Sequence, residues 1–148
     1  MLKRLKVYFI HSVKIDYQTL LYRPILSSPV CLAHELILPL SPNYKERYVK
    51  ELHEEADVIV AEVSDPNFAL KLELKWAVAT NKPIKYISLS NNIPSKYKKL
   101  VPNIEQFTND RSIVKIIEDF ISEQANVVKQ ADTTVILGDI DEVIPPNA

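Results

Sequence analysis

The chain has 148 residues, of which 47% are hydrophobic and 25% charged, and its formal net charge is -1. This length supports one domain with a single core and is too short for two. Nucleic acids and membranes favour basic surfaces, so the near-neutral charge gives no reason to expect either partner, and a small metabolite fits better. The single cysteine, Cys31, allows no internal disulfide, and we expect a cytoplasmic protein.

Apolar runs and helical spacing predict alternating strands and helices. In the first half we expect strands at residues 6–10 and 30–38 and helices at residues 15–26 and 43–55. In the second half we expect strands at residues 57–63, 84–89 and 104–107 and helices at residues 66–80, 94–100 and 111–129. This order predicts an α/β fold with a doubly wound, mostly parallel, Rossmann-like sheet of about five strands and helices on both faces.

Residues 1–130 make up the predicted domain, and residues 131–148 form a C-terminal tail. Within the tail, residues 133–137 are β-prone, and we expect either an edge or partner-pairing strand or a loose end. His34 falls inside the predicted second strand, where a backbone hydrogen bond would satisfy its ring.

Residues 56–77 carry the best candidate for chemistry, because a buried strand there leads directly into a helix. We expect Asp65 to cap that helix and Pro66 to occupy its first position. Glu73 then falls in the second helical turn. Open α/β sheets bind ligands just beyond the carboxyl ends of their strands, so Glu73 is expected near such a crevice.

Two segments carry a family resemblance, ADVIVAEVSDPNFALKLELKWAVATNKPI at residues 56–84 and VYFIHSVK at residues 7–14. The first resembles the signature region of the nucleoside 2-deoxyribosyltransferase superfamily, most closely its deoxynucleoside 5'-monophosphate N-glycosidase branch. The second is similar to the family's first strand and the serine loop that follows. The resemblance extends over roughly residues 6–107.

The resemblance implies that Glu73 attacks the anomeric carbon of a nucleoside and forms a covalent ribosyl-enzyme, which water or a second base resolves. It also implies that Tyr8 orients this nucleophile. The residues that would hold the sugar and any phosphate are Ser12, Lys14, Asn67 and Ser95. In the glycosidase branch, the serine that Ser95 matches reaches the phosphate site of the neighbouring subunit. The resemblance therefore implies a homodimer or higher homo-oligomer.

Each of these residues also has a structural interpretation. Glu73 would be a solvated helix residue paired with Lys71 or Lys75, Tyr8 a core aromatic, and Asn67 a helix cap. The sequence also departs from the family within the site. His11, Ala69 and Lys71 stand where the family has glycine, and the family's helix aspartate falls at Val49, with Glu46 and Glu51 as the nearest substitutes.

No cofactor or metal is expected. The histidines His11, His34 and His53 have no metal-ligand spacing. The single glycine, Gly138, leaves no phosphate-binding loop or nucleophile elbow.

Three hypotheses remain open. The first is an N-glycosidase or deoxyribosyltransferase that acts on a nucleoside or nucleotide, without nucleic-acid or membrane partners. The second is a nucleotide-binding module on the same fold that senses without cleaving. The third is a non-catalytic assembly protein that pairs through the strand at residues 133–137.

Overall fold

The computed structural model describes residues 4–65, 67–89, 101 and 103–143, with side chains described as far as residue 127. Its centre is a sheet of five parallel strands in the order β2-β1-β3-β4-β5. The strands are β1 Lys6–Ile10, β2 Glu35–Ile37, β3 Val58–Glu62, β4 Ile84–Ser88 and β5 Glu105–Gln106. The predicted doubly wound α/β fold is therefore confirmed.

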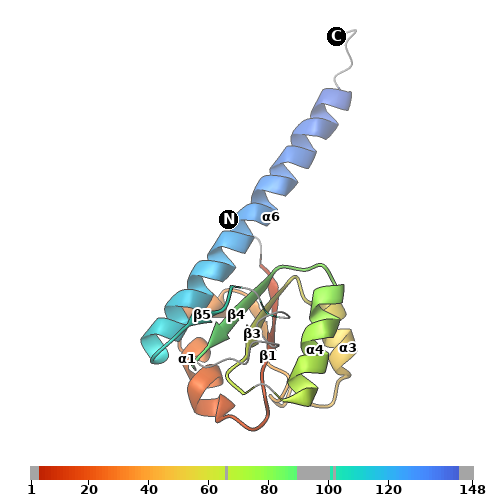
Figure 1. Cartoon of the computed structure of the whole chain (residues 1–148). Coiled ribbons are helices and arrows are strands. Elements are labelled where there is room, and N and C mark those ends of the chain that lie inside the picture. Colours follow the sequence, from red (N-terminus) through yellow and green to blue (C-terminus); the bar gives the residue numbers. More distant parts are fainter. Residues whose placement is uncertain (1–3, 66, 90–100, 102, 144–148) are drawn as a thin grey trace.

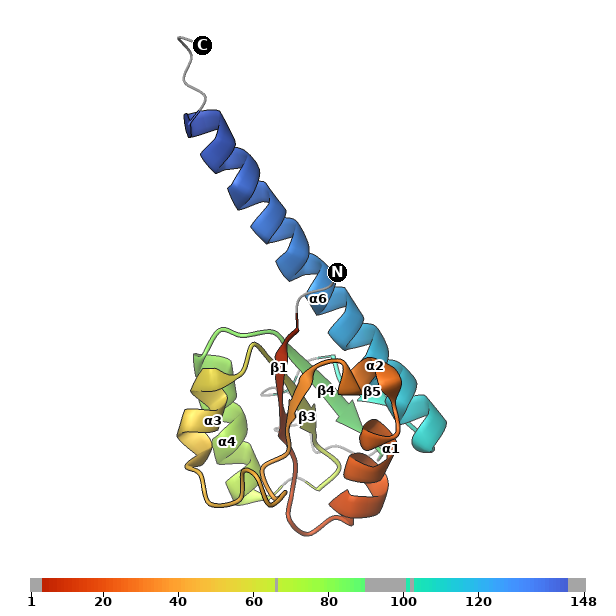
Figure 2. The same cartoon turned by 180° about the vertical axis from the view of Figure 1, so that it is seen from behind.

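Helices cover both faces of this sheet (Figures 1 and 2). The helices α3 and α4 lie on one face, and α1, α2 and the long helix α6 lie on the other. Their bounds are Gln18–Tyr22 for the π-helix η1, Arg23–Leu26 for α1, Pro29–Leu32 for α2, Val49–Glu55 for α3, Phe68–Ala79 for α4 and Asp110–Val143 for α6. Helix α3 begins later than the predicted residue 43.

Side-chain alternation along β1 divides the core into two halves. Val7 and Phe9 belong to the half that packs against α1 and α6, whereas Tyr8 and Ile10 belong to the half under α3 and α4. All four side chains are buried. The hydroxyl of Tyr8 is therefore directed to the α3 and α4 face, where its partners must be found.

The predicted strand at residues 30–38 was wrong in its first part, because residues 29–32 form α2. The Ser28 hydroxyl caps this helix by accepting from the Cys31 N–H at 3.1 Å, and Pro29 occupies a first-turn position. His34 precedes β2 instead of lying within it. Its Nδ1 accepts from the Leu5 N–H at 2.9 Å, so the expected backbone hydrogen bond is present.

Helix α6 has 34 residues and is about 51 Å long at 1.5 Å per residue. It extends well beyond the sheet (Figure 1). Residues 133–137, for which the sequence left open a strand or a loose end, continue α6 in the structure, where the helix pairs their backbone groups. No helix in the described part of the chain is long and apolar enough to cross a membrane. The predicted helix at residues 94–100 lies outside the described residues.

Helix α4 ends at Ala79, and two residues later Asn81 has a left-handed backbone conformation, with φ of 60°. Asn81 follows the C-cap residue Thr80, and glycine is the residue most favoured at this position. We expect Asn81→Gly to raise the free energy of unfolding by about 0.5–1 kcal/mol, because the substitution removes the side-chain penalty of this conformation. Urea denaturation would measure the change. Asn81→Ala should lower stability, and equal stability of the two variants would contradict this explanation.

Candidate active site

The strand order makes the carboxyl ends of β1 and β3 the place where a ligand crevice is expected. Strand β1 lies between β2 and β3, so the chain leaves β1 toward one edge of the sheet and leaves β3 toward the other. Open parallel sheets bind ligands at such a switch point. The loop after β1 carries Ser12 and Lys14, and the loop after β3 carries Asp65 and Asn67.

Ser12, Asp65 and Asn67 form one hydrogen-bonded cluster where this crevice is expected. The Ser12 hydroxyl donates to Asp65 Oδ2 at 2.6 Å. The Asn67 amide nitrogen donates to Ser12 Oγ at 2.8 Å and to Asp65 Oδ2 at 3.2 Å. The Asn67 side-chain oxygen accepts from the Leu70 N–H at 2.9 Å and caps α4. The prediction that Asp65 caps this helix was wrong, because Asn67 directly precedes the first helical residue and Ser12 engages Asp65.

The other two predicted binding residues are less informative. The backbone N–H of Lys14 donates to Ser12 Oγ at 3.0 Å, while the Lys14 side chain is exposed. Ser95 lies outside the described residues. The structure thus brings Ser12 and Asn67 together, with Lys14 at the same loop.

The Ser12 hydroxyl, followed by the Asn67 amide, lowers the pKa of Asp65 below its usual value. The folded state therefore binds fewer protons than the unfolded state between the two pKa values. The contribution of Asp65 to the stability of the folded state is complete above the ordinary aspartate pKa of about 3.9. It is lost as the pH falls through the lower pKa that Asp65 has in the folded state.

We expect Ser12→Ala to move the pKa of Asp65 back up toward its ordinary value, because the largest cause of the shift is removed. Carbon-detected NMR titration of the Asp65 carboxyl would measure it. Ser27→Ala is the matched control, since the Ser27 hydroxyl donates to the Arg23 carbonyl on a different helix. An unchanged Asp65 pKa in Ser12→Ala would contradict the assignment.

Glu73 is held against the sheet by two donors. The Tyr8 hydroxyl donates to Glu73 Oε1 at 2.5 Å, and His53 Nε2 donates to the same oxygen at 3.0 Å. The three residues come from β1, α4 and α3, and the rings of Tyr8 and His53 lie 4.7 Å apart. The alternative of a surface ion pair with Lys71 or Lys75 does not describe this structure, because Glu73 is directed inward and its side chain is only 18% exposed.

The two donors leave the carboxylate unequally engaged. Both converge on Oε1, and among the described residues no hydrogen bond reaches Glu73 Oε2. Burial first, and then the charge of Glu73, raise the pKa of the Tyr8 hydroxyl far above its usual value. Tyr8 therefore stays protonated and keeps donating, while Oε2 retains its lone pairs for another partner.

His53 is the site residue that sequence reasoning missed. Its side chain is 2% exposed, and from α3 it reaches Glu73 through the hydrogen bond of Nε2 to Oε1. Glu51, expected as a substitute for the family aspartate, instead pairs with Arg47 at 3.4 Å on the exposed side of the helix. Helical spacing from Val49 and Leu52 would have placed His53 on the buried face, and this signal was available in the sequence.

His11 stands where the family has a loop glycine, and its ring is directed into a cluster with two tyrosines. Its Nδ1 donates to the Ser12 carbonyl at 3.0 Å, which leaves Nε2 to accept from the Tyr22 hydroxyl at 2.8 Å. The ring also stacks on Tyr17 at 4.9 Å. Burial lowers the pKa of His11. A buried, neutral and fully bonded histidine of this kind anchors the loop after β1 to η1.

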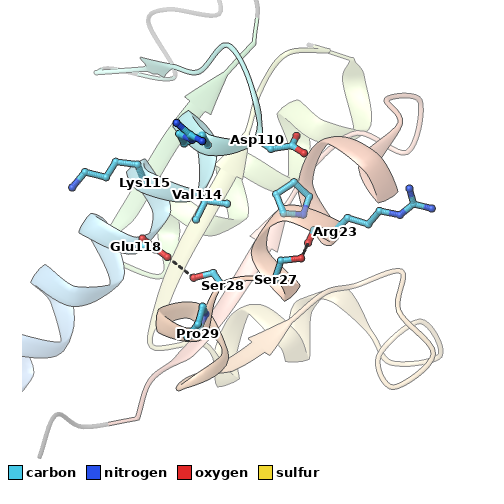
Figure 3. A pocket seen from close by; sticks show the side chains of 10 residues that line it. Arg23, Ser27, Ser28, Pro29, Asp110, Val114, Lys115 and Glu118 are labelled. Carbon is cyan, nitrogen blue, oxygen red and sulfur yellow. Dashed lines mark hydrogen bonds between the residues drawn. The ribbon is translucent and has the colours of Figure 1, made fainter.

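Among the described residues, two of the best-formed cavities flank the fold, and Glu73 lines neither. One, of about 500 Å³, lies between α1, α2 and α6 on the opposite face of the sheet (Figure 3). In it the Ser28 hydroxyl donates to Glu118 at 2.6 Å, while Arg23 and Lys115 point away from each other. These two cations therefore do not converge on one ligand. The other cavity, of about 660 Å³, lies between α3 and α4.

Among the described residues, no group of three or more His, Cys, Asp or Glu side chains is arranged to hold a metal ion. No protein-family model matches the chain, and none of the curated proteins is significantly similar to it. The family resemblance therefore remains an expectation from the residues matched in the sequence.

Proposed function

We propose that this protein cleaves the N-glycosidic bond of a nucleoside or nucleoside 5'-monophosphate, with Glu73 as the nucleophile. The observation that carries the proposal is the one-sided engagement of the Glu73 carboxylate. Tyr8 and His53 both hold Oε1, which fixes the side chain and leaves Oε2 as the attacking atom. The resemblance of residues 56–84 to the deoxyribosyltransferase superfamily supports the same role.

The proposed reaction has two displacements at the anomeric carbon. In the first, Glu73 Oε2 forms a bond to this carbon, and the bond to the base nitrogen breaks with its electron pair leaving on the base. The base then takes a proton from solvent water. In the second, water or another base attacks the anomeric carbon and the carboxylate leaves, so that Glu73 is regenerated. The attacking water or base loses a proton to solvent.

The cluster of Ser12, Asp65 and Asn67 is suited to the rest of the substrate. Asn67 precedes Glu73 by six residues, which corresponds to about 9 Å along the axis of α4. That span is comparable with the length of a sugar phosphate. Hydroxyl and amide groups at one end would hold sugar hydroxyls, and the exposed ammonium of Lys14 would approach a 5'-phosphate.

The test is chromatography of a panel of nucleosides and nucleoside 5'-monophosphates after incubation with the protein, with and without an acceptor base. Release of free base from at least one member is the expected result. Products that appear only with an acceptor base would assign transfer, and products in its absence would assign hydrolysis. No release from any member over hours would contradict cleavage.

A binding module that does not cleave is the second candidate. It is favoured by the low exposure of Glu73 and by the side chains of His11 and Lys71, which stand where the family has glycine. This candidate requires saturable nucleotide binding without base release. Calorimetry on the same panel separates it from the enzyme.

We also propose, from the resemblance of Ser95 to an intersubunit serine, that the active unit is a homodimer or higher homo-oligomer. Sedimentation velocity on the full chain would test this state. A monomer at the concentration used for the activity panel would contradict the proposal for the oligomer and leave the proposal for Glu73 unaffected.

A further inference from the structure

The cavity between α3 and α4 is separate from the crevice expected at the carboxyl ends of the strands. Residues that line its walls include His53 and Glu54 from α3, Trp76 and Ala79 from α4, and Thr80 and Lys82 from the turn that follows. It therefore lies toward the C-terminal end of α4, whereas Asn67 caps the N-terminal end. Its volume of about 660 Å³ is within the range of small-molecule sites.

His53, which lines this cavity, carries a polar ring atom without a partner among the described residues, Nδ1. In the neutral form of the ring, Nε2 donates to Glu73 Oε1 and Nδ1 is an acceptor. Nδ1 is buried without any hydrogen-bond partner in the described part of the chain. Buried polar atoms are nearly always paired, so this atom is an unmet acceptor. A donor brought by a ligand would satisfy it.

Neighbouring groups hold the His53 ring in place. The Tyr8 ring packs on it at 4.7 Å, and the Trp76 ring meets it edge to face at 6.5 Å and 81°. The Lys82 ammonium donates to the carbonyls of His53 and Glu54, both at 2.6 Å, and so ties down the end of α3. The His53 ring, and with it Nδ1, is therefore held in place before any ligand binds.

Trp76 provides an apolar aromatic surface beside this acceptor. Its side chain is 46% exposed, and it is the only tryptophan in the chain. A half-exposed indole next to a buried acceptor matches a planar ring that carries a hydrogen-bond donor. Because Nδ1 is buried, a ligand that reaches it must displace part of the ring packing around His53, in which Trp76 takes part.

We propose that this cleft binds a small planar heteroaromatic molecule whose ring N–H donates to His53 Nδ1 while its face packs against Trp76. The site goes beyond the proposed glycosidic chemistry and does not depend on it. Its connection to Glu73 is direct, however, because the same imidazole ring bonds both the ligand and the carboxylate. Ligand bound in the cleft would thereby strengthen the donation of Nε2 to Glu73.

The experiment is an NMR titration of the ¹⁵N-labelled protein with indole and, separately, with benzothiophene, which has the same shape but lacks the N–H. Indole is expected to shift the single tryptophan indole N–H signal and the His53 Nδ1 signal saturably. Benzothiophene should bind about tenfold more weakly or worse, because it leaves Nδ1 unpaired. Equal affinity for the two probes, or no saturable shift of Trp76, would overturn the proposal.

A pair of α4 variants checks the location. Ala79→Leu fills the cleft with a good helix former and should abolish saturable indole binding, whereas Val78→Leu adds bulk at an exposed position that does not line the cleft. Indole binding by Ala79→Leu at wild-type affinity would also overturn the proposal. The titration needs no turnover, so its failure leaves the role of Glu73 standing, and an inactive enzyme leaves the cleft standing.

Discussion

Glu73→Gln is expected to lower the rate of base release by at least about 10³-fold, which is the largest effect on activity that the site predicts. Glutamine keeps the size of the side chain, and its carbonyl oxygen still accepts from Tyr8 and His53. What it lacks is a carboxylate oxygen that can form the covalent bond to the anomeric carbon. The loss should therefore appear in kcat, while nucleotide affinity measured by calorimetry stays close to that of the wild type.

The matched control for this change is Glu123→Gln, which makes the same chemical substitution at an exposed position on α6. Both variants should unfold at similar denaturant concentrations. A Glu73→Gln variant that retains more than about a tenth of wild-type kcat would remove Glu73 from the role of nucleophile.

Tyr8→Phe is expected to lower kcat by roughly 10²-fold and the free energy of unfolding by about 1–3 kcal/mol. The ring still fills its place in the core, so the change removes only the hydroxyl that donates to Glu73 at 2.5 Å. Without it the carboxylate has one donor instead of two and is free to leave the attacking geometry. Urea denaturation and steady-state kinetics would measure the two effects.

Tyr86→Phe is the control for the loss of a tyrosine hydroxyl. Tyr86 is also buried on the α3 and α4 face of the sheet, on β4, but among the described residues no hydrogen bond joins it to Glu73. Its kcat should match the wild type. If Tyr8→Phe and Tyr86→Phe behave alike in kcat, Tyr8 has only a packing role.

Much of the fold could be predicted because its strands are buried on both faces. The continuous apolar runs at residues 7–10 and 58–61 identify such strands without tertiary information. The same criterion predicted a strand at residues 30–32, where the structure has a helix. Val30 and Leu32 are apolar but 39% and 53% exposed, and the Ser28 cap with Pro29 makes the segment a helix.

The site could be predicted only in part. Glu73 and Tyr8 were paired through the family resemblance, since 65 residues separate them and no local pattern joins them. His53 reaches Glu73 only because α3 packs beside α4, and residue spacing cannot show which helices are neighbours. Asp65 and Asn67 are both good capping residues, and the choice between them depends on Ser12, a residue from another loop.

In the proposed reaction Glu73 becomes covalently attached to the sugar, and trapping of this covalent species tests the step directly. The protein would be incubated with a substrate nucleoside or nucleotide that carries fluorine at the sugar 2-position, quenched with acid and digested with trypsin. The fluorine slows hydrolysis of the intermediate, because it destabilises the oxocarbenium-like transition state. Cleavage after Lys71 and Lys75 releases the peptide LELK, in which Glu73 is the only acidic side chain.

Mass spectrometry is expected to find the fluorinated sugar on this peptide, in amounts that match the burst of released base. Base release with LELK unmodified, or with the sugar on another peptide, would contradict covalent attachment to Glu73.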